Sequence, residues 1–261
     1  MKNWTIYGLV AWLVEHPSEA SISSGQSELK ALMSESLPLF ESILITGSVQ
    51  NVFVVTPVGP VGIAGLGFDM GMNGIVADGM LREVFKVDGL MLPAGILPAW
   101  AIDLVPKSFG LAIEVEDFGL VAPAKILLET RDLSRATPPT REKDAKLLKA
   151  LVPKGALVVS IGPSKISAKL FDLDYEASLT AGPYGTAAGA ATIKATGFDR
   201  AVDALKAPPA EMLGQATPAL IAARGMAKTE SDGFLSWRIE GILTGRILVN
   251  GMDVTKMGVK N

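Results

Sequence analysis

The hydrophobic and polar positions of this chain follow two different periods. Before residue 40, apolar residues recur every three or four positions, which predicts a helix over 25–36 after a first helix over 5–15. The pair His16-Pro17 separates the two helices, because proline cannot continue a helix. The residues that set the spacing of the second helix are Leu29, Leu32, Met33, Leu37 and Phe40. A helical lead-in over 1–40 is therefore expected.

From Ile43 onward the pattern becomes typical of β-strands. Stretches that alternate or are rich in β-branched residues are bounded by Gly, Pro, Asn or Asp, which predicts consecutive antiparallel strands. The pair Asn73-Gly74 indicates a tight hairpin turn, and prolines around Trp100 bracket a short apolar helix. The strands expected in this half span 43–57, 59–74, 74–90 and 108–120.

The second half of the chain alternates between helices and strands. Residues 122–134 are ambiguous, and a bulge near Phe171 is expected because apolar residues on both sides of it compete for one face of the strand region. Gly225 is expected just past the end of a helix, and Asn250-Gly251 indicates a second tight turn. Helices are predicted over 138–152, 198–207 and 208–225, strands over 156–182 and 185–198, and a last hairpin over 234–255.

These elements predict an α+β fold with a large curved, mainly antiparallel β-sheet and helices packed on one face. We expect one β-rich domain over 1–261, because no linker-like stretch divides the chain except 135–143, which is the expected boundary if it divides at all. No fixed residue period supports a repeat protein.

Charge and residue usage exclude several classes of function. The net charge is −3 and the 24 Lys and Arg residues are scattered, so the basic patch of a nucleic-acid-binding protein is absent. Without cysteine the chain has no disulfide, no thiolate catalysis and no Cys-ligated metal site. The single histidine, His16, would have to serve any Ser-His-Asp triad, and multi-histidine metal sites cannot form within one chain. No cofactor or metal is predicted.

The N-terminal apolar run over 6–14 is too short to cross a bilayer. It lacks the charged region and the cleavage site of a signal peptide. We expect a short buried helix instead. The side chains expected to point inward are those of Trp4, Leu9 and either Trp12 or Leu13. If the chain is a fragment, an export signal or anchor would precede Met1.

Two short motifs are incomplete. Ser27 and Lys30 have the Ser-x-x-Lys spacing of penicillin-recognising enzymes, but the companion elements fail, because Ser231-Asp232-Gly233 and Lys228-Thr229-Glu230 differ from them and lie in one stretch. Gly65-Leu66-Gly67 begins like a dinucleotide-binding loop, but no helix follows to hold a phosphate. We favour an exposed helix as the interpretation of Ser27 and Lys30, and strand bends as the interpretation of Gly65 and Gly67.

Carboxylates spaced two apart on predicted strands are the remaining candidates for chemistry. Residues two apart share a face, so such pairs could act as acid and base or hold a hard cation. The carboxylate pairs fit the solvent side of alternating strands better than a catalytic site. His16 likewise fits a residue at a helix end better than a catalytic base. The acidic candidates are Glu114, Glu116, Asp117, Asp172 and Asp174.

Several phrases resemble a domain-of-unknown-function family of diderm bacterial envelope proteins that is loosely similar to AsmA-like lipid-transport proteins. The phrases are 12–18, 37–40, 56–59, 88–93, 98–100, 104–106, 225–230 and 247–251. The resemblance implies a shared fold and a periplasmic location, and it supplies no catalytic residues.

Three hypotheses follow. The first is a non-catalytic periplasmic protein that binds a lipid or another hydrophobic ligand on a curved β-sheet, since apolar grooves accept such ligands. The second is a hydrolase or transferase that uses carboxylates such as Glu114, Glu116, Asp172 and Asp174, which requires two of them to converge in a pocket. The third is an oligomeric structural component of the envelope, which requires an exposed strand edge or apolar patch.

Overall fold

The computed structural model describes residues 3–38, 40–130, 141–182, 187–206, 216–243 and 245–255. The helices are α1 (Asn3–Glu15), α2 (Glu19–Ser24), α3 (Gln26–Glu35), α4 (Ala99–Ile102), α5 (Val121–Thr130), α6 (Arg141–Leu151), α7 (Phe198–Ala204) and α9 (Ala216–Met226). The strands are β1 (Ile43–Thr56), β2 (Gly59–Met72), β3 (Gly79–Met91), β4 (Pro106–Phe118), β5 (Leu157–Ala168), β6 (Asp172–Ala181), β7 (Ala187–Thr196), β8 (Lys228–Thr229), β9 (Leu235–Gly241), β10 (Ile247–Val249) and β11 (Met252–Asp253).

The strands form one antiparallel sheet that does not close on itself. Its order is β1-β2-β3-β4-β5-β6-β7-β9-β10-β11, with β8 paired to β9. Strands that are neighbours along the chain are therefore mostly neighbours in space, as expected for a sheet built from successive hairpins. Between Thr56 and Gly59 the first hairpin needs only the two residues Pro57 and Val58. The predicted α+β fold with a large antiparallel sheet is confirmed.

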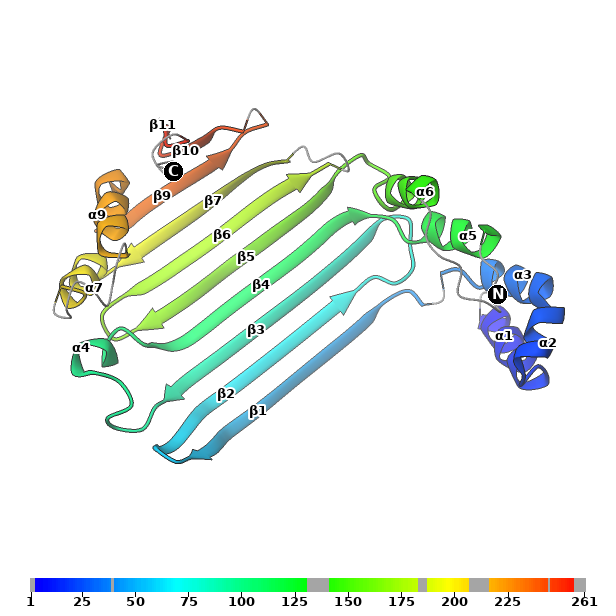
Figure 1. Ribbon diagram of the computed structural model, residues 1–261, viewed down its shortest axis with the longest axis horizontal. Coiled ribbons are helices and arrows are strands. Elements are labelled where there is room, and N and C mark those ends of the chain that lie inside the picture. The colour runs from blue at the N-terminus through cyan, green and yellow to red at the C-terminus, as the bar shows by residue number, and fades with distance from the viewer. Residues whose placement is uncertain are drawn as a thin grey trace.

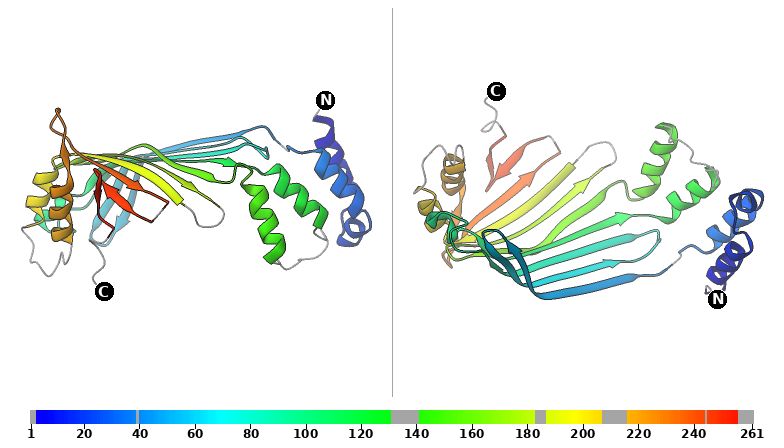
Figure 2. Two further views of the ribbon diagram at one scale, coloured as in Figure 1. Left: turned by 90° about the horizontal axis from the view of Figure 1, so that it is seen from above. Right: turned by 60° about the horizontal axis from the view of Figure 1, so that its bottom comes forward.

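Helices lie at the two ends of the strands (Figure 1). The helices α1–α3, α5 and α6 lie at one end, and α4, α7 and α9 lie at the other. Figure 2 shows the sheet curving toward the side on which α5, α6, α7 and α9 lie. The middle of the sheet has no described helix over it.

The buried hydrophobic side chains lie near these ends. The main cluster joins Ala195, Leu235, Trp237 and Val249 of β7, β9 and β10, with Phe198 and Met226 packed against it. Further buried residues are Trp12, Leu29, Leu128, Val152 and Val202, which lie in or next to the helices. Among the described residues, β1–β6 contribute no buried hydrophobic side chain. The core therefore does not extend beneath the broad part of the sheet.

Several local predictions were wrong. The Asn73-Gly74 pair does not form a tight turn, because β3 begins only at Gly79 and the Asn73 side chain spans the loop, bonding Met80 N (2.6 Å) and Asp78 O (2.8 Å). No bulge lies near Phe171, because the residues between Ala168 and Asp172 connect β5 to β6. The register shift in this region lies between Ile161 and Ser164.

The short helix α2 was not predicted. Gly225 lies inside α9 instead of just past its end. The ambiguous residues of 122–134 that the structure describes are helical, in α5. Pro138, where the helix predicted over 138–152 begins, lies outside the described residues, as does most of the 135–143 boundary. The strands β4 and β5, on either side of that segment, pair directly. Trp12 is buried while Leu13 is exposed, which resolves that alternative.

Candidate functional site: an uncovered apolar sheet face

The strand register separates the sheet into an apolar face and a polar face. Side chains at directly paired positions point to the same face, so a row of partners can be followed across the sheet. One row reads Ile45, Met70, Glu83, Ile113, Ile161, Ala177, Ala191, Ile239, Val249 and Met252. A parallel row reads Ile43, Met72, Leu81, Val115, Val159, Leu179, Gly189, Gly241 and Ile247. These rows define the apolar face, which also carries Val49, Phe53, Val55, Phe68, Phe85 and Trp237.

The row between them points to the opposite side and is largely polar. It reads Leu44, Gly71, Arg82, Glu114, Ser160, Ser178, Ala190, Glu240, Leu248 and Asp253, and it defines the polar face. Among the described residues at paired positions, Glu83 is the one charged side chain on the apolar face. An antiparallel sheet with one solvated face normally packs its apolar face against something else.

That apolar face is open over most of its width. Phe53 is 57% exposed and Val55 is 88% exposed, and Val49, Phe85 and Leu179 are also exposed. The chain exposes 16,737 Å², whereas a compact monomer of 27.4 kDa exposes about 11,000 Å². Exposed apolar side chains gathered on one face in this way are typical of binding surfaces.

An apolar pocket lies where β3 and β4 separate. The last paired residues of these strands are Val87 and Phe109, and beyond them the chain passes through α4 before it returns. The pocket has a volume of about 340 Å³ and is open to solvent. Leu90, Leu97 and Val105 line it, together with Ile96 and Ile102, which are exposed. The size lies within the range of small-ligand pockets.

A separate depression on the polar face has a volume of about 450 Å³. The depression on the polar face spans β5–β7 and is lined by Lys165, Asp174, Glu176 and Lys194, among others. Its charges alternate in sign across neighbouring strands, since Asp174 is paired with both Lys165 and Lys194. Opposite charges at paired positions stabilise a sheet, which accounts for this cluster without a ligand.

The acidic candidates do not converge. Glu114 of β4 is paired with Ser160 of β5, which is paired in turn with Ser178 of β6. Asp174 also lies on β6, four residues from Ser178, so it is separated from Glu114 both across the strands and along them. Glu116 shares the polar face with Glu114, and Asp172 shares it with Asp174. Asp172 accepts a hydrogen bond from Ser167. The arrangement is that of a solvated sheet face, and it brings no two candidate carboxylates from different strands into one pocket.

Asp117 has a different role from the other acidic candidates. It lies at an irregularity of β4 with φ 65°, and its carboxylate accepts a hydrogen bond from Lys154 Nζ at 2.6 Å. Lys154 also lies 3.0 Å from Asp78. Hydrogen bonds to Asp117 and Asp78 raise the pKa of the Lys154 ammonium. The three groups link the loop before β3, the end of β4 and the segment before β5.

The remaining sequence candidates have structural partners. The ring of His16 stacks on Trp12 with centroids 3.9 Å apart, and its Nδ1 lies 2.8 Å from Trp12 O, as expected for a residue at a helix end. Ser27 lies in α3, at the opposite end of the sheet from Lys228 (Figure 1). Gly65 and Gly67 lie inside β2, so no helix begins after them.

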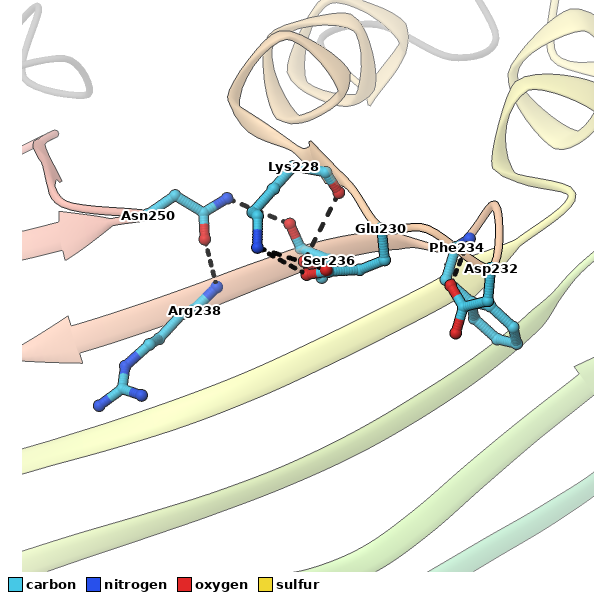
Figure 3. Close-up of polar contacts among 7 residues, drawn as sticks. All are labelled: Lys228, Glu230, Asp232, Phe234, Ser236, Arg238 and Asn250. Atoms are coloured by element: carbon cyan, nitrogen blue, oxygen red, sulfur yellow. Dashed lines mark hydrogen bonds and ion pairs between the residues drawn. The ribbon is translucent and has the colours of Figure 1, made fainter.

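A polar cluster lies where β8, β9 and the β10–β11 turn meet (Figure 3). Ser236 is buried and its hydroxyl donates to Glu230 Oε1 at 2.6 Å, while Lys228 Nζ lies 3.3 Å from Glu230 Oε2. The hydrogen bond from Ser236, with help from Lys228, lowers the pKa of Glu230. The Asn250 amide donates to Met226 O and Ser236 O, and its oxygen accepts from Arg238 N. These bonds hold α9, β9 and the turn together, and sequence reasoning did not find them.

The C-terminal hairpin should weaken in acid. The Thr255 hydroxyl and backbone N–H, with Arg246, donate to Asp253 and lower the pKa of its carboxyl to about 2. A carboxyl whose pKa is depressed on folding stabilises the fold above its unfolded pKa of about 4, and that contribution is lost as the pH falls toward about 2. We expect the protection of the β10 and β11 amides from hydrogen exchange, relative to the intrinsic exchange rate at each pH, to fall over this range. Asp253→Asn should remove the pH dependence, and an unchanged profile in that variant would contradict the assignment.

Comparison with protein-family models, with curated proteins and with solved structures finds no match. The resemblance to envelope proteins therefore stays a prediction. Among the described residues, no helix is long and apolar enough to cross a membrane, and no group of three or more acidic or histidine side chains is placed to hold a metal ion.

Proposed function

We propose that the protein binds the hydrocarbon chains of a lipid, or another elongated hydrophobic ligand, on the apolar face of its curved sheet. The observation that carries the proposal is the continuous apolar row from Ile45 to Met252, which crosses the sheet with Glu83 as its one charged member. The resemblance to envelope proteins adds the periplasm as the proposed location.

The shape of the face favours chains over compact ligands. A strand of 14 residues such as β2 extends about 45 Å, whereas one lipid leaflet contributes about 15 Å of hydrocarbon to a bilayer. The face offers few hydrogen-bonding groups, so it would select for apolar length rather than for a particular polar pattern. The pocket at the β3–β4 separation adds a recess at one end of the strands.

Neighbouring residues on opposite faces provide the test. Phe85 lies on the apolar face and Val84 on the polar face of β3, so Phe85→Glu puts a charge on the proposed site while Val84→Glu adds the same charge elsewhere. Because an unpaired charge in an apolar site is costly, we expect Phe85→Glu to weaken binding of cis-parinaric acid by about tenfold or more. Val84→Glu should bind nearly as the unchanged protein does. Fluorescence titration measures both.

A second pair of variants controls for a local folding defect at Phe85, whose ring centroid lies 5.1 Å from that of Phe68. Leu179 on the apolar face and Ser178 on the polar face of β6 are both exposed. Leu179→Glu should weaken binding and Ser178→Glu should not, with unchanged circular dichroism in all four variants. Failure of the delipidated protein to take up the fatty acid, or equal binding by both members of each pair, would refute the proposal.

A further inference from the structure

The first strand of the sheet has a free outer edge. β1 pairs with β2 on one side, and no described segment runs along its other side (Figure 1). The 14 residues of β1 include no charged residue and no proline. Natural proteins usually protect long edge strands with charges, proline or a covering element, because an open edge pairs with other strands.

The opposite edge of the sheet is different. There β11 has two residues and β10 has three, and Arg246 forms an ion pair with Asp253 beside them at 2.8 Å. A short, charged edge offers little for another strand to pair with. The long uncharged edge is therefore confined to β1.

The sequence of β1 is complementary to itself about Val49. If two copies pair antiparallel with Val49 opposite Val49, then Ile43 lies opposite Val55 and Ile45 opposite Phe53 on the apolar face. On the polar face, Leu44 lies opposite Val54. Leu44 is 75% exposed and Val54 58% exposed in the single chain, although they lie on the polar face. This register gives each of them an apolar partner.

The same register accommodates the irregular residue of the strand. Asn51 has φ 54° and would lie opposite Gly47 of the second copy. No atom lies within 4 Å of the position that a Cβ on Gly47 would occupy, so this site has room. Slipping the register by one residue would place apolar-face residues opposite polar-face residues, which the pleat does not allow.

We propose that two copies of this chain pair through β1, antiparallel about a two-fold axis at Val49 and perpendicular to the sheet. Such an axis keeps the apolar faces of both copies on one side, so the sheet and its apolar face continue from one copy into the other. The contact is isologous and closes at two copies. The inference depends on the strand edge and not on the proposed ligand.

Cysteine crosslinking tests the register directly, because the chain has no cysteine of its own. Opposed residues of antiparallel strands have Cα atoms about 4.5–5.5 Å apart, within the range that a disulfide spans. Val49→Cys should form a disulfide-linked dimer under mild oxidation. Val54→Cys alone should not, but mixed with Leu44→Cys it should give the mixed disulfide. Absence of the Val49→Cys dimer, or equal crosslinking by Val54→Cys alone, would overturn the register.

Sedimentation of the full chain tests the association itself. We expect a dimer that Val49→Lys weakens by about tenfold or more, because two lysines would face each other at the axis. Leu179→Lys, on the apolar face away from the edge, should leave the dimer intact. A monomer at every concentration overturns the proposal. So does a dimer that survives Val49→Lys and is lost in Leu179→Lys, because the copies would then associate through their apolar faces.

Discussion

Replacing Trp237 with alanine is expected to lower the free energy of unfolding by about 3–5 kcal/mol, the usual loss for a large aromatic residue removed from a core. Trp237 is only 6% exposed and belongs to the main buried cluster. Its ring lies 5.2 Å from that of Phe198, and its Nε1 donates to Ala223 O of α9 at 2.7 Å. Urea unfolding followed by circular dichroism measures the change.

The loss of stability is expected to be large because the protein has few other buried side chains that stabilise its fold. The cluster around Trp237 packs against Phe198 of α7 and Met226 of α9, so it joins both helices to the sheet. Trp237→Phe keeps most of the ring and removes the N–H donor, so it should cost about 1–3 kcal/mol, the range for leaving a buried carbonyl without a partner. A loss below about 1 kcal/mol in Trp237→Ala would show that the cluster does not hold this end together.

Much of the fold follows from local sequence patterns. The strands β1, β2, β4 and β7 and the helices α1, α6 and α7 lie where periodicity and turn residues place them. The turn at Asn250-Gly251 is confirmed, since φ is positive at both residues and Val249 pairs with Met252. These features depend on residues close together in the chain, so the sequence determines them locally.

The other features depend on contacts between distant residues. The Asn73-Gly74 pair indicates a turn, but its length is set by the Asn73 bonds across the loop. Alternation within one strand shows that it has an apolar side, but only the register shows that these sides join into one face. Nothing in the local pattern distinguishes an apolar face that is covered from one that is open. The candidate site could therefore not be predicted beyond an apolar sheet surface.

Replacing Asn250 with alanine is expected to lower the free energy of unfolding by about 2.5–6.5 kcal/mol, the sum of three lost hydrogen bonds and a backbone penalty. Its side chain makes three hydrogen bonds, with Arg238 N, Met226 O and Ser236 O (Figure 3), and each is worth about 0.5–1.5 kcal/mol. Alanine would also have to adopt φ 48°, a left-handed conformation that costs about 1–2 kcal/mol. Urea unfolding measures the sum.

Two further variants separate these contributions. Asn250→Gly loses the same three bonds but accepts the left-handed conformation, so it should be more stable than Asn250→Ala by about 1 kcal/mol. Asn250→Asp keeps an oxygen for Arg238 N but places a carboxylate against two carbonyl oxygens, so it should remain destabilised. If Asn250→Gly matches the unchanged protein, the backbone conformation alone explains the residue. If Asn250→Ala does so as well, the side chain does not tie α9 to the sheet.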